Sequence, residues 1–398
     1  MNICFIGTDI GPSVNGAFVR GHVNNVVRLS KELTQMGHKI HIITNMPKFS
    51  NPILCKKWMH FADVSCFSTI FPSLKANGPE FAIKALDRVI SDSRKGCFDI
   101  INVHSGFPAL GILSALSKRL TKHKTVHTLY SPFDYSFNDS ILDRLITSKI
   151  TFSSFSSLDG LVAVSENVRR SLLSRRVDSK KIRVIPPVIS EEFLCDDGHS
   201  QEMRVRLKIY DHAPVVTYIG GFEASKGLTL LLQIIAEVVS RIPKVVFIIA
   251  LNIPNSDHRI KMLELSLHSY GFSRNVRLIG ITDKIADILR ICDVFVAPYL
   301  HTMGVADYPL AVFEAMAMSK TVIAFDVGGI SSMLSEERGI LIQPGDTMGF
   351  AETVVRMVNK RAEVNTMGKA ASEYVAQNFY VKNVATKTIK LFEDLLDG

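Results

Sequence analysis

VVTYIGGFEASKGLTLLLQIIAEVVS, residues 215–240, contains a strand, a glycine-flanked loop and a helix in immediate succession. Residues 215–219 are β-branched or aromatic, which favours a strand. Residues 228–240 carry apolar side chains at helical spacing. When such a unit recurs along a chain, it builds a parallel sheet with helices on both faces. This stretch therefore indicates an α/β fold.

The same alternation continues in both directions. In the first half we expect strands at 2–6, 39–44, 100–103, 125–127, 160–164 and 182–185, and helices at 18–35, 80–93, 109–120 and 166–174. In the second half we expect strands at 245–251, 276–279, 294–297 and 321–325, and helices at 283–290, 310–318, 364–379 and 381–396. The sequence thus predicts two doubly wound, Rossmann-like domains.

Pro186-Pro187 interrupts this pattern, and a polar, acidic stretch follows. We predict a first domain at 1–187, a linker at 188–200 and a second domain at 201–375. The remainder, 376–398, is predicted to form a helix that packs back toward the first domain.

The composition fits a globular protein, with 47% hydrophobic and 21% charged residues. The six cysteines are scattered singly, without metal-ligand spacing. No apolar run approaches the ~20 residues that cross a bilayer, and no basic region precedes the first apolar run. We therefore expect a cytoplasmic protein.

Positive charge is concentrated in the first half. Residues 1–187 contain 25 Lys and Arg against 13 Asp and Glu, which gives +12, whereas the whole chain carries +8. This half is predicted to bind anionic phosphate groups of a lipid, a nucleic acid or an acceptor substrate. The alternative is a basic surface that is only solvated and binds no partner. Within residues 49–61, Lys56, Lys57 and Trp58 suggest either an interfacial patch for a lipid-linked acceptor or a packed surface segment.

Two glycine-bearing loops lead from strands into helices. The loop at 7–16 ends in Asn15-Gly16, and the loop at 220–227 contains Lys226. Helix N-termini of this kind expose N–H groups to anions. Neither loop has the dinucleotide G-x-G-x-x-G pattern or Walker A spacing. An ordinary turn at Gly16 and a solvated lysine at 226 remain open as alternatives.

Glu314 lies one turn inside an otherwise apolar helix at 310–317. A carboxylate in such a place must face a ligand site or find a partner. The alternative is a solvent-facing glutamate on an amphipathic helix.

Taken in order, these motifs resemble the retaining GT-B glycosyltransferases of family 4 over nearly the whole chain. They run from FDIINVH at 98–104 through VAVS at 162–165, VIP at 184–186, GGFEASKG at 220–227 and VRLIG at 276–280 to DVFVAP at 293–298, EAMA at 314–317 and Gly328-Gly329. The resemblance implies two domains facing a central cleft.

It also implies roles for single residues. Glu314 would bind the ribose hydroxyls, Lys226 the donor diphosphate, and the N–H groups of Leu310 and Ala311 the sugar or phosphate. Gly16 would lie beside the diphosphate from the other domain. His127 would contact the transferred sugar, unless it is a hydrogen-bonded histidine at a strand end; His104 would shape the cleft.

The chain departs from the family pattern at three positions. Ala306 replaces the first glutamate of the Glu-x7-Glu motif, Gly221 an arginine and Pro187 an asparagine. We hypothesise that Asp307 takes over recognition of sugar hydroxyls, and that an unidentified basic residue shares the phosphate.

The sequence thus predicts a hexosyltransferase that needs no metal or other cofactor. It would transfer a sugar with retention, from a UDP- or GDP-linked donor to a glycan or lipid-linked acceptor, in glycan, glycolipid or cell-surface polysaccharide synthesis. A further prediction left open is that the basic first half contacts the inner face of a membrane. A non-catalytic subunit that binds a partner or sugar nucleotide is the alternative. A nicotinamide oxidoreductase is not supported, because the sequence lacks the G-x-G-x-x-G turn that such an enzyme needs. The sequence also contains no recognisable nucleic-acid-binding module.

Overall fold

The computed structural model describes residues 1–10, 21–46, 59–68, 74–106, 110–132, 149–194, 200–210, 212–301 and 307–398. These residues form two compact units. Unit 1 consists of Met1–Val188, Met303–Asp307 and Val381–Gly398, and unit 2 of Ile189–Thr302 and Tyr308–Tyr380. Each unit is built around its own parallel sheet, which confirms the predicted pair of Rossmann-like α/β domains.

Unit 1 contains a seven-stranded sheet with the order β3-β2-β1-β4-β5-β6-β7. Its strands are β1 (Asn2–Thr8), β2 (Lys39–Met46), β3 (Asp63–Ser68), β4 (Ile100–Ser105), β5 (Lys124–Leu129), β6 (Gly160–Ala163) and β7 (Ile182–Val184). Its helices are α1 (Gly21–Gln35), α3 (Leu74–Ser93), α4 (Leu110–Thr121), α6 (Lys149–Ser156), α7 (Glu166–Ser174), η1 (Ser179–Lys181) and α16 (Val381–Asp397).

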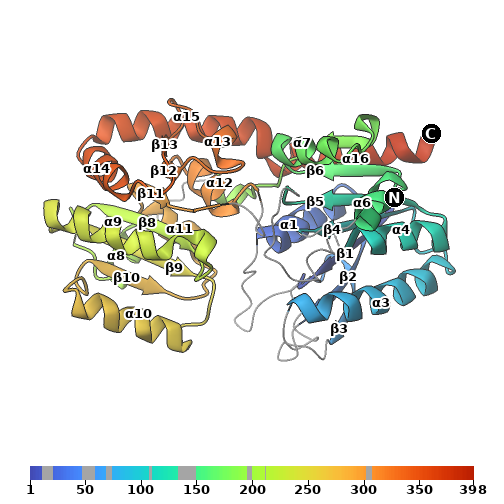
Figure 1. Cartoon of the computed structure of the whole chain (residues 1–398), viewed down its shortest axis with the longest axis horizontal. Coiled ribbons are helices and arrows are strands. Elements are labelled where there is room, and N and C mark those ends of the chain that lie inside the picture. Colours follow the sequence, from blue (N-terminus) through green and yellow to red (C-terminus); the bar gives the residue numbers. More distant parts are fainter. Residues whose placement is uncertain are drawn as a thin grey trace. The chain divides into compact units, whose positions relative to one another are not determined.

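The strand order of unit 1 reverses between β1 and β4. Right-handed crossovers then place α1 and α4 on opposite faces of the sheet. In the structure α3, α4 and α6 pack beside one another, and α1 packs against α16 (Figure 1). Because both faces are covered, β4 is buried along its whole length, including its polar residues Asn102, His104 and Ser105.

Unit 2 repeats this plan in a six-stranded sheet with the order β10-β9-β8-β11-β12-β13. Its strands are β8 (Val215–Gly220), β9 (Val246–Leu251), β10 (Val276–Ile279), β11 (Val294–Ala297), β12 (Thr321–Phe325) and β13 (Ile340–Ile342). Its helices are η2 (Glu191–Phe193), α8 (Ser200–Arg206), η3 (Ala224–Lys226), α9 (Leu228–Arg241), α10 (His258–Ser269), α11 (Ile285–Arg290), α12 (Leu310–Ala317), α13 (Ile330–Met333), α14 (Thr347–Val358) and α15 (Arg361–Phe379).

Most predicted elements match the structure to within one or two residues, and α7 begins and ends where predicted. The sequence pattern missed β3, α6, α8, α10, α13, β13 and α14. The strand β3 lies at the edge of its sheet, and its sequence, DVSCFS, contains no two adjacent aliphatic residues that would mark a strand. The predicted start of α1 at residue 18 lies outside the described residues.

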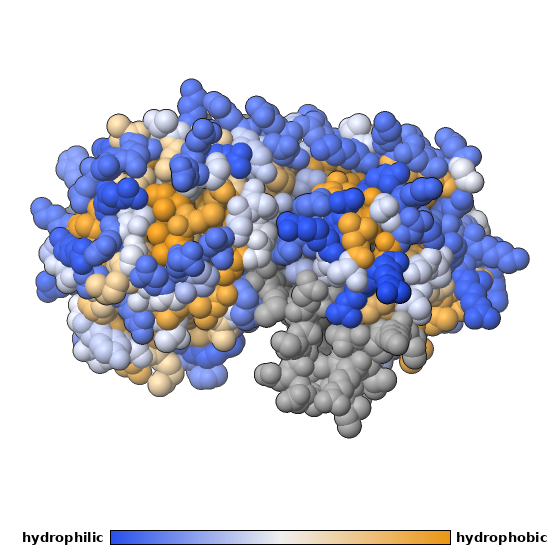
Figure 2. Space-filling model, turned by 45° about the horizontal axis from the view of Figure 1, so that its top comes forward, coloured by the Kyte–Doolittle hydropathy of each residue, from blue (hydrophilic) through white to orange (hydrophobic). Residues whose placement is uncertain are grey.

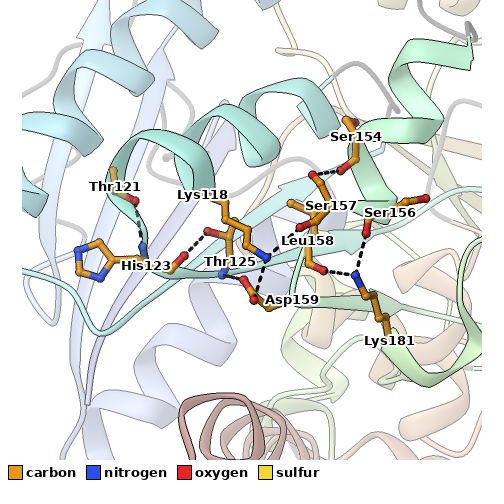
Figure 3. A network of polar contacts seen from close by, with 10 residues as sticks. All are labelled: Lys118, Thr121, His123, Thr125, Ser154, Ser156, Ser157, Leu158, Asp159 and Lys181. Atoms are coloured by element: carbon orange, nitrogen blue, oxygen red, sulfur yellow. Dashed lines mark hydrogen bonds and ion pairs between the residues drawn. The ribbon is translucent and has the colours of Figure 1, made fainter. Parts of the chain in front are cut away.

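A polar network at the amino ends of β5 and β6 uses two lysines of unit 1 (Figure 3). Lys118 Nζ binds Asp159 Oδ1 at 2.9 Å, and the other oxygen of Asp159 accepts from the backbone N–H of Thr125. Lys181 Nζ donates to the carbonyl oxygens of Ser156 and Leu158 at 2.7 and 2.9 Å. Part of the positive charge of this half is therefore used in holding strands and loops together.

Candidate functional site

The strand order of unit 2 reverses between β8 and β11, and doubly wound sheets bind ligands beyond the carboxyl ends of strands at such a point. Residues 221–227 follow β8, and Pro298 and Tyr299 follow β11. The backbone N–H of Leu300 donates to the carbonyl of Ser225 at 2.8 Å. The Tyr299 hydroxyl donates to the carbonyl of Ile219 at 2.6 Å. These bonds fix the two loops to each other.

Gly227 is required where the first loop enters α9. Its backbone has φ of 64°, the left-handed region that favours glycine. A Cβ atom at this position would lie 1.8 Å from the carbonyl oxygen of Pro298. The loop therefore reaches its position only because residue 227 has no side chain.

Lys226 ends η3, directly before Gly227, and its side chain is half-buried. The ammonium Nζ lies 4.3 Å from the centroid of the Tyr299 ring, a cation–π geometry. Burial lowers the pKa of Lys226 from 10.5 to about 8, although the negative charge of Glu223 opposes this shift. The structure thus gives Lys226 a specific neighbour, unlike the solvated lysine of the alternative.

Glu314 belongs to α12, and its charge acts on the same tyrosine. It is 6% exposed, which excludes the solvent-facing alternative. Burial raises the pKa of the Tyr299 hydroxyl, and the negative charge of Glu314 raises it further. Lys226 and Glu314 therefore both adjoin Tyr299. The predicted backbone donors Leu310 and Ala311 open α12, where the first N–H groups have no acceptor within the helix. Sequence reasoning missed Tyr299, because only the fold brings it under Lys226.

The loop that carries Gly221 also has a basic neighbour. The guanidinium carbon of Arg259 lies 5.3 Å from the centroid of the Phe222 ring, next to Gly221. Arg259 is half-exposed and pairs with Asp257 at 2.8 Å. Arg259 is therefore a second cation beside this loop, in addition to Lys226. No motif marks it, because it belongs to the start of α10.

His127 has a different environment, in the interior of unit 1. It is fully buried in β5, and its Nε2 and Nδ1 lie 2.7 and 2.6 Å from the hydroxyls of Ser105 and Ser114. Burial lowers its pKa to about 3, so the ring is neutral at physiological pH. This geometry favours the hydrogen-bonded histidine of the alternative, and the sugar contact of His127 stays a prediction. His104, likewise buried, lies 3.1 Å from the Tyr130 hydroxyl through Nδ1.

Asp307 also departs from its expected place. It is fully buried within unit 1, where Ser165 Oγ and Asn167 Nδ2 donate to its two carboxylate oxygens at 2.6 and 3.0 Å. Both carboxylate oxygens of Asp307 thus accept hydrogen bonds within unit 1, and recognition of sugar hydroxyls by Asp307 stays a prediction.

Gly16 and Ala306 lie outside the described residues, as do residues 49–58 of the predicted interfacial patch. Within the described ranges, no three His, Cys, Asp or Glu side chains are grouped so that they could hold a metal ion. None of the described helices combines the length and the apolar character that crossing a membrane requires. On the face drawn in Figure 2, hydrophilic residues surround smaller apolar patches.

Comparison with known proteins finds a glycosyltransferase family model for each half of the chain. The family model described as Glycosyltransferase Family 4 matches residues 19–193. The model described as Glycosyl transferases group 1 matches residues 213–360. The two matches follow each other along the chain and fall on the two sheets.

Relatives of similar length align over most of the chain. N-acetyl-alpha-D-glucosaminyl L-malate synthase of Bacillus anthracis is 23% identical over 98% of this chain and 97% of its own length. The phosphatidylinositol N-acetylglucosaminyltransferase GPI3 subunit of Saccharomyces cerevisiae is 24% identical over 93% of this chain and 79% of its own length. The crystal structure of Anabaena HepE with UDP-glucose superposes with a TM-score of 0.76 at 14% identity, over 98% of this chain and 99% of that one. At that identity the likeness shows the fold alone.

Proposed function

This chain is a glycosyltransferase of family 4 with the GT-B fold. We propose that it transfers a hexose-type sugar from a nucleoside diphosphate to an acceptor hydroxyl with retention of configuration. Such a reaction needs two things from the protein. One is a place for the anionic diphosphate that leaves, and the other is a group that holds the nucleoside.

The cluster around Tyr299 carries this proposal. Lys226 supplies a cation at a glycine-flanked helix start, and Glu314 supplies a buried carboxylate on the adjacent helix. We assign Lys226 to the diphosphate and Glu314 to the ribose hydroxyls, with the N–H groups of Leu310 and Ala311 facing the phosphate or sugar. The Tyr299 ring lies under the ammonium of Lys226, and the negative charge of Glu314 acts on the Tyr299 hydroxyl, so the lysine and the glutamate share one neighbour.

The chemistry follows from where charge develops. As the bond to the sugar breaks, positive charge spreads over the sugar ring and negative charge gathers on the diphosphate. A fixed ammonium and the N-terminal ends of α9 and α12 stabilise that negative charge without rearrangement. We therefore propose that turnover requires no added metal, and that an excess of EDTA leaves the rate unchanged.

The donor is proposed to carry UDP. HepE was crystallised with UDP-glucose, and the names of both relatives describe transfer of an N-acetylglucosaminyl group. Among donors we therefore place UDP-N-acetylglucosamine and UDP-glucose first and GDP-sugars second.

The acceptor is proposed to be anionic. The names of the two relatives identify malate and phosphatidylinositol, which both carry negative charge. The basic balance of residues 1–187, 25 Lys and Arg against 13 Asp and Glu, would attract either one. A lipid acceptor would bring the chain to the surface of a membrane, and we propose a cytoplasmic protein that reaches the inner face in that way.

The test is a donor panel followed by matched variants. Thermal shift with UDP-, GDP- and ADP-sugars identifies the nucleotide, because a ligand of the native state raises its melting temperature. Release of nucleoside diphosphate then measures turnover. Lys226→Ala and Glu314→Ala are each expected to lower kcat/KM by about 100-fold. The controls Lys244→Ala and Glu264→Ala, both at exposed positions of unit 2, should retain it.

The alternative is a non-catalytic subunit. It is motivated by Ala306 and Gly221, which replace functional residues of the family, and by the word subunit in the name of the yeast relative. No turnover with any donor, together with partner binding that survives Lys226→Ala and Glu314→Ala, would favour this second function.

A further inference from the structure

Positive charge is concentrated at one edge of the unit 1 sheet. The strands β5, β6 and β7 are neighbours in this parallel sheet, so the turns that precede them lie together at its amino-end edge (Figure 3). These turns contain nine Lys and Arg against two Asp, which gives +7 of the +12 that the first half carries. They comprise residues 118–124, 156–159 and 175–183.

Some of these cations are used within unit 1. Lys118 and Lys181 both bind the turn at 156–159, the first through Ser157 and Asp159 and the second through Ser156 and Leu158. These bonds tie the three turns to one another. The edge therefore has a fixed shape that does not depend on a partner.

Four other cations have no such role. The side chains of Arg119, Lys122, Arg176 and Lys180 are exposed, and they form no hydrogen bond or ion pair with the part of the chain that the structure describes. We call these four residues the basic edge. The acidic end of α16 belongs to the opposite face of the sheet from α4, since α16 packs against α1. Unpaired like charges repel one another, so the basic edge indicates an anionic partner.

An apolar stripe runs along α4 to the same place. Ile112, Leu116 and Leu120 are four residues apart and so share one face of the helix, where they are 40%, 39% and 53% exposed. Leu120 directly follows Arg119, so the stripe ends at the basic edge. Basic and aliphatic side chains on one surface are typical of proteins that lie on anionic bilayers. A nucleic acid would use the cations but would leave the leucines exposed.

We propose that the basic edge and the apolar stripe of α4 together form a binding surface for an anionic lipid bilayer. The cations contact lipid phosphates, and Leu116 and Leu120 enter the interface. This inference goes beyond the proposed function, in which the lipid acceptor itself brings the chain to a membrane. Ligands of doubly wound sheets bind beyond the carboxyl ends of the strands, whereas this surface lies at their amino ends. Membrane binding is therefore expected without donor or acceptor.

Co-sedimentation of the full chain with vesicles tests the proposal. Vesicles of phosphatidylcholine with about one third phosphatidylglycerol should bind the chain at least about 100-fold more tightly than vesicles of phosphatidylcholine alone, because each cation near an anionic surface adds to the affinity. Since salt screens exposed charges, binding should weaken as the salt concentration rises.

Matched variants locate the surface. Arg119→Gln and Lys180→Gln, one from each basic turn, should each lower the partition coefficient about fivefold, and the double variant about 25-fold, because both cations contact the same bilayer. Leu120→Gln should lower it about tenfold. The controls Lys244→Gln and Leu265→Gln, at exposed positions of unit 2, should bind like the wild type. All five side chains are exposed, so the melting temperature should change little.

Three outcomes would overturn the inference. The first is equal binding to both kinds of vesicle, or binding to neither. The second is a set of basic-edge and stripe variants that all bind like the wild type, which places the contact elsewhere on the chain. The third is a duplex oligonucleotide that the wild type retains in a gel shift while vesicles stay unbound, which identifies a nucleic acid as the partner.

Failure of the proposed function looks different, because the vesicle assay needs no turnover. Lys226→Ala should bind vesicles like the wild type while it loses release of nucleoside diphosphate. A chain that turns over a UDP-sugar but does not bind vesicles contradicts the membrane surface alone. A chain that binds vesicles but turns over no donor contradicts the proposed function alone.

Discussion

The ammonium of Lys226 lies 4.3 Å from the centroid of the Tyr299 ring. Lys226 belongs to the loop after β8 and Tyr299 to the loop after β11, so this contact joins the two loops. Tyr299 is itself fixed by its hydrogen bond to the carbonyl of Ile219 and lies edge-on to Tyr218, with ring centroids 6.2 Å apart. The cation is therefore held against a fixed aromatic ring, on whose hydroxyl the negative charge of Glu314 also acts.

Binding of UDP should weaken as the pH rises through about 8. The pKa of Lys226 lies near 8, and the ammonium attracts diphosphate only while it is protonated. Titration calorimetry with UDP between pH 6.5 and 9.5 measures this dependence. Lys226→Arg keeps its charge throughout and should abolish the decline; a decline that persists in Lys226→Arg belongs to another group.

Whereas UDP binding weakens as the pH rises, the contribution of Lys226 to the free energy of unfolding should increase. Its pKa is lower in the folded chain than the ordinary 10.5, so between about pH 8 and 10.5 the unfolded chain binds more protons. The free energy of unfolding that is due to Lys226 therefore rises with pH in this window. Urea denaturation of the wild type and Lys226→Met, compared at each pH, isolates this part.

Replacing the tyrosine should separate its ring from its hydroxyl. Tyr299→Phe keeps the ring under Lys226 but loses the bond to Ile219, which costs about 1 kcal/mol of stability. Tyr299→Leu also loses the cation–π contact, worth roughly 0.5–2 kcal/mol, and should weaken UDP binding by about 2- to 30-fold. Calorimetry checks both variants, with the exposed Tyr270→Leu as control. Equal affinities for Tyr299→Phe and Tyr299→Leu would contradict a role for the ring.

Adding one methyl group at Gly227 should displace the loop. Gly227→Ala brings a Cβ to 1.8 Å from the Pro298 carbonyl oxygen, in backbone that already has φ of 64°. Gly271→Ala is the matched control, with φ of 77° and no atom within 4 Å. The control should cost about 1–2 kcal/mol of stability and keep UDP affinity, whereas Gly227→Ala should cost more and weaken binding. Urea denaturation and calorimetry compare the two, and similar behaviour would contradict the tight approach.

His127 should affect stability in acid. Its pKa is about 3 in the fold, below the ordinary 6.5, so the unfolded chain binds the proton first as the pH falls. Stability contributed by the neutral ring is therefore lost below about pH 6.5. His127→Ala should remove this dependence, and at pH 7 it should lower the free energy of unfolding by about 2–4 kcal/mol, since it leaves a cavity and two serine hydroxyls without the ring. Urea denaturation at several pH values measures both effects, and the exposed His268→Ala should resemble the wild type.

The amino-acid sequence by itself determined the two parallel α/β sheets, because short, mostly apolar strands alternate along it with helices that have an apolar face. It also located Lys226 and Glu314, since a lysine in a glycine loop and a carboxylate on an apolar helix stand out locally. Only the tertiary structure placed Tyr299 beside both of them, Ser165 on Asp307, and two serines around His127. These partners come from elements far apart in the chain, so neither spacing nor periodicity records them. A side chain reaches a ligand or a hydrogen-bond partner according to what packs around it, and that packing exists only after the sheets have formed.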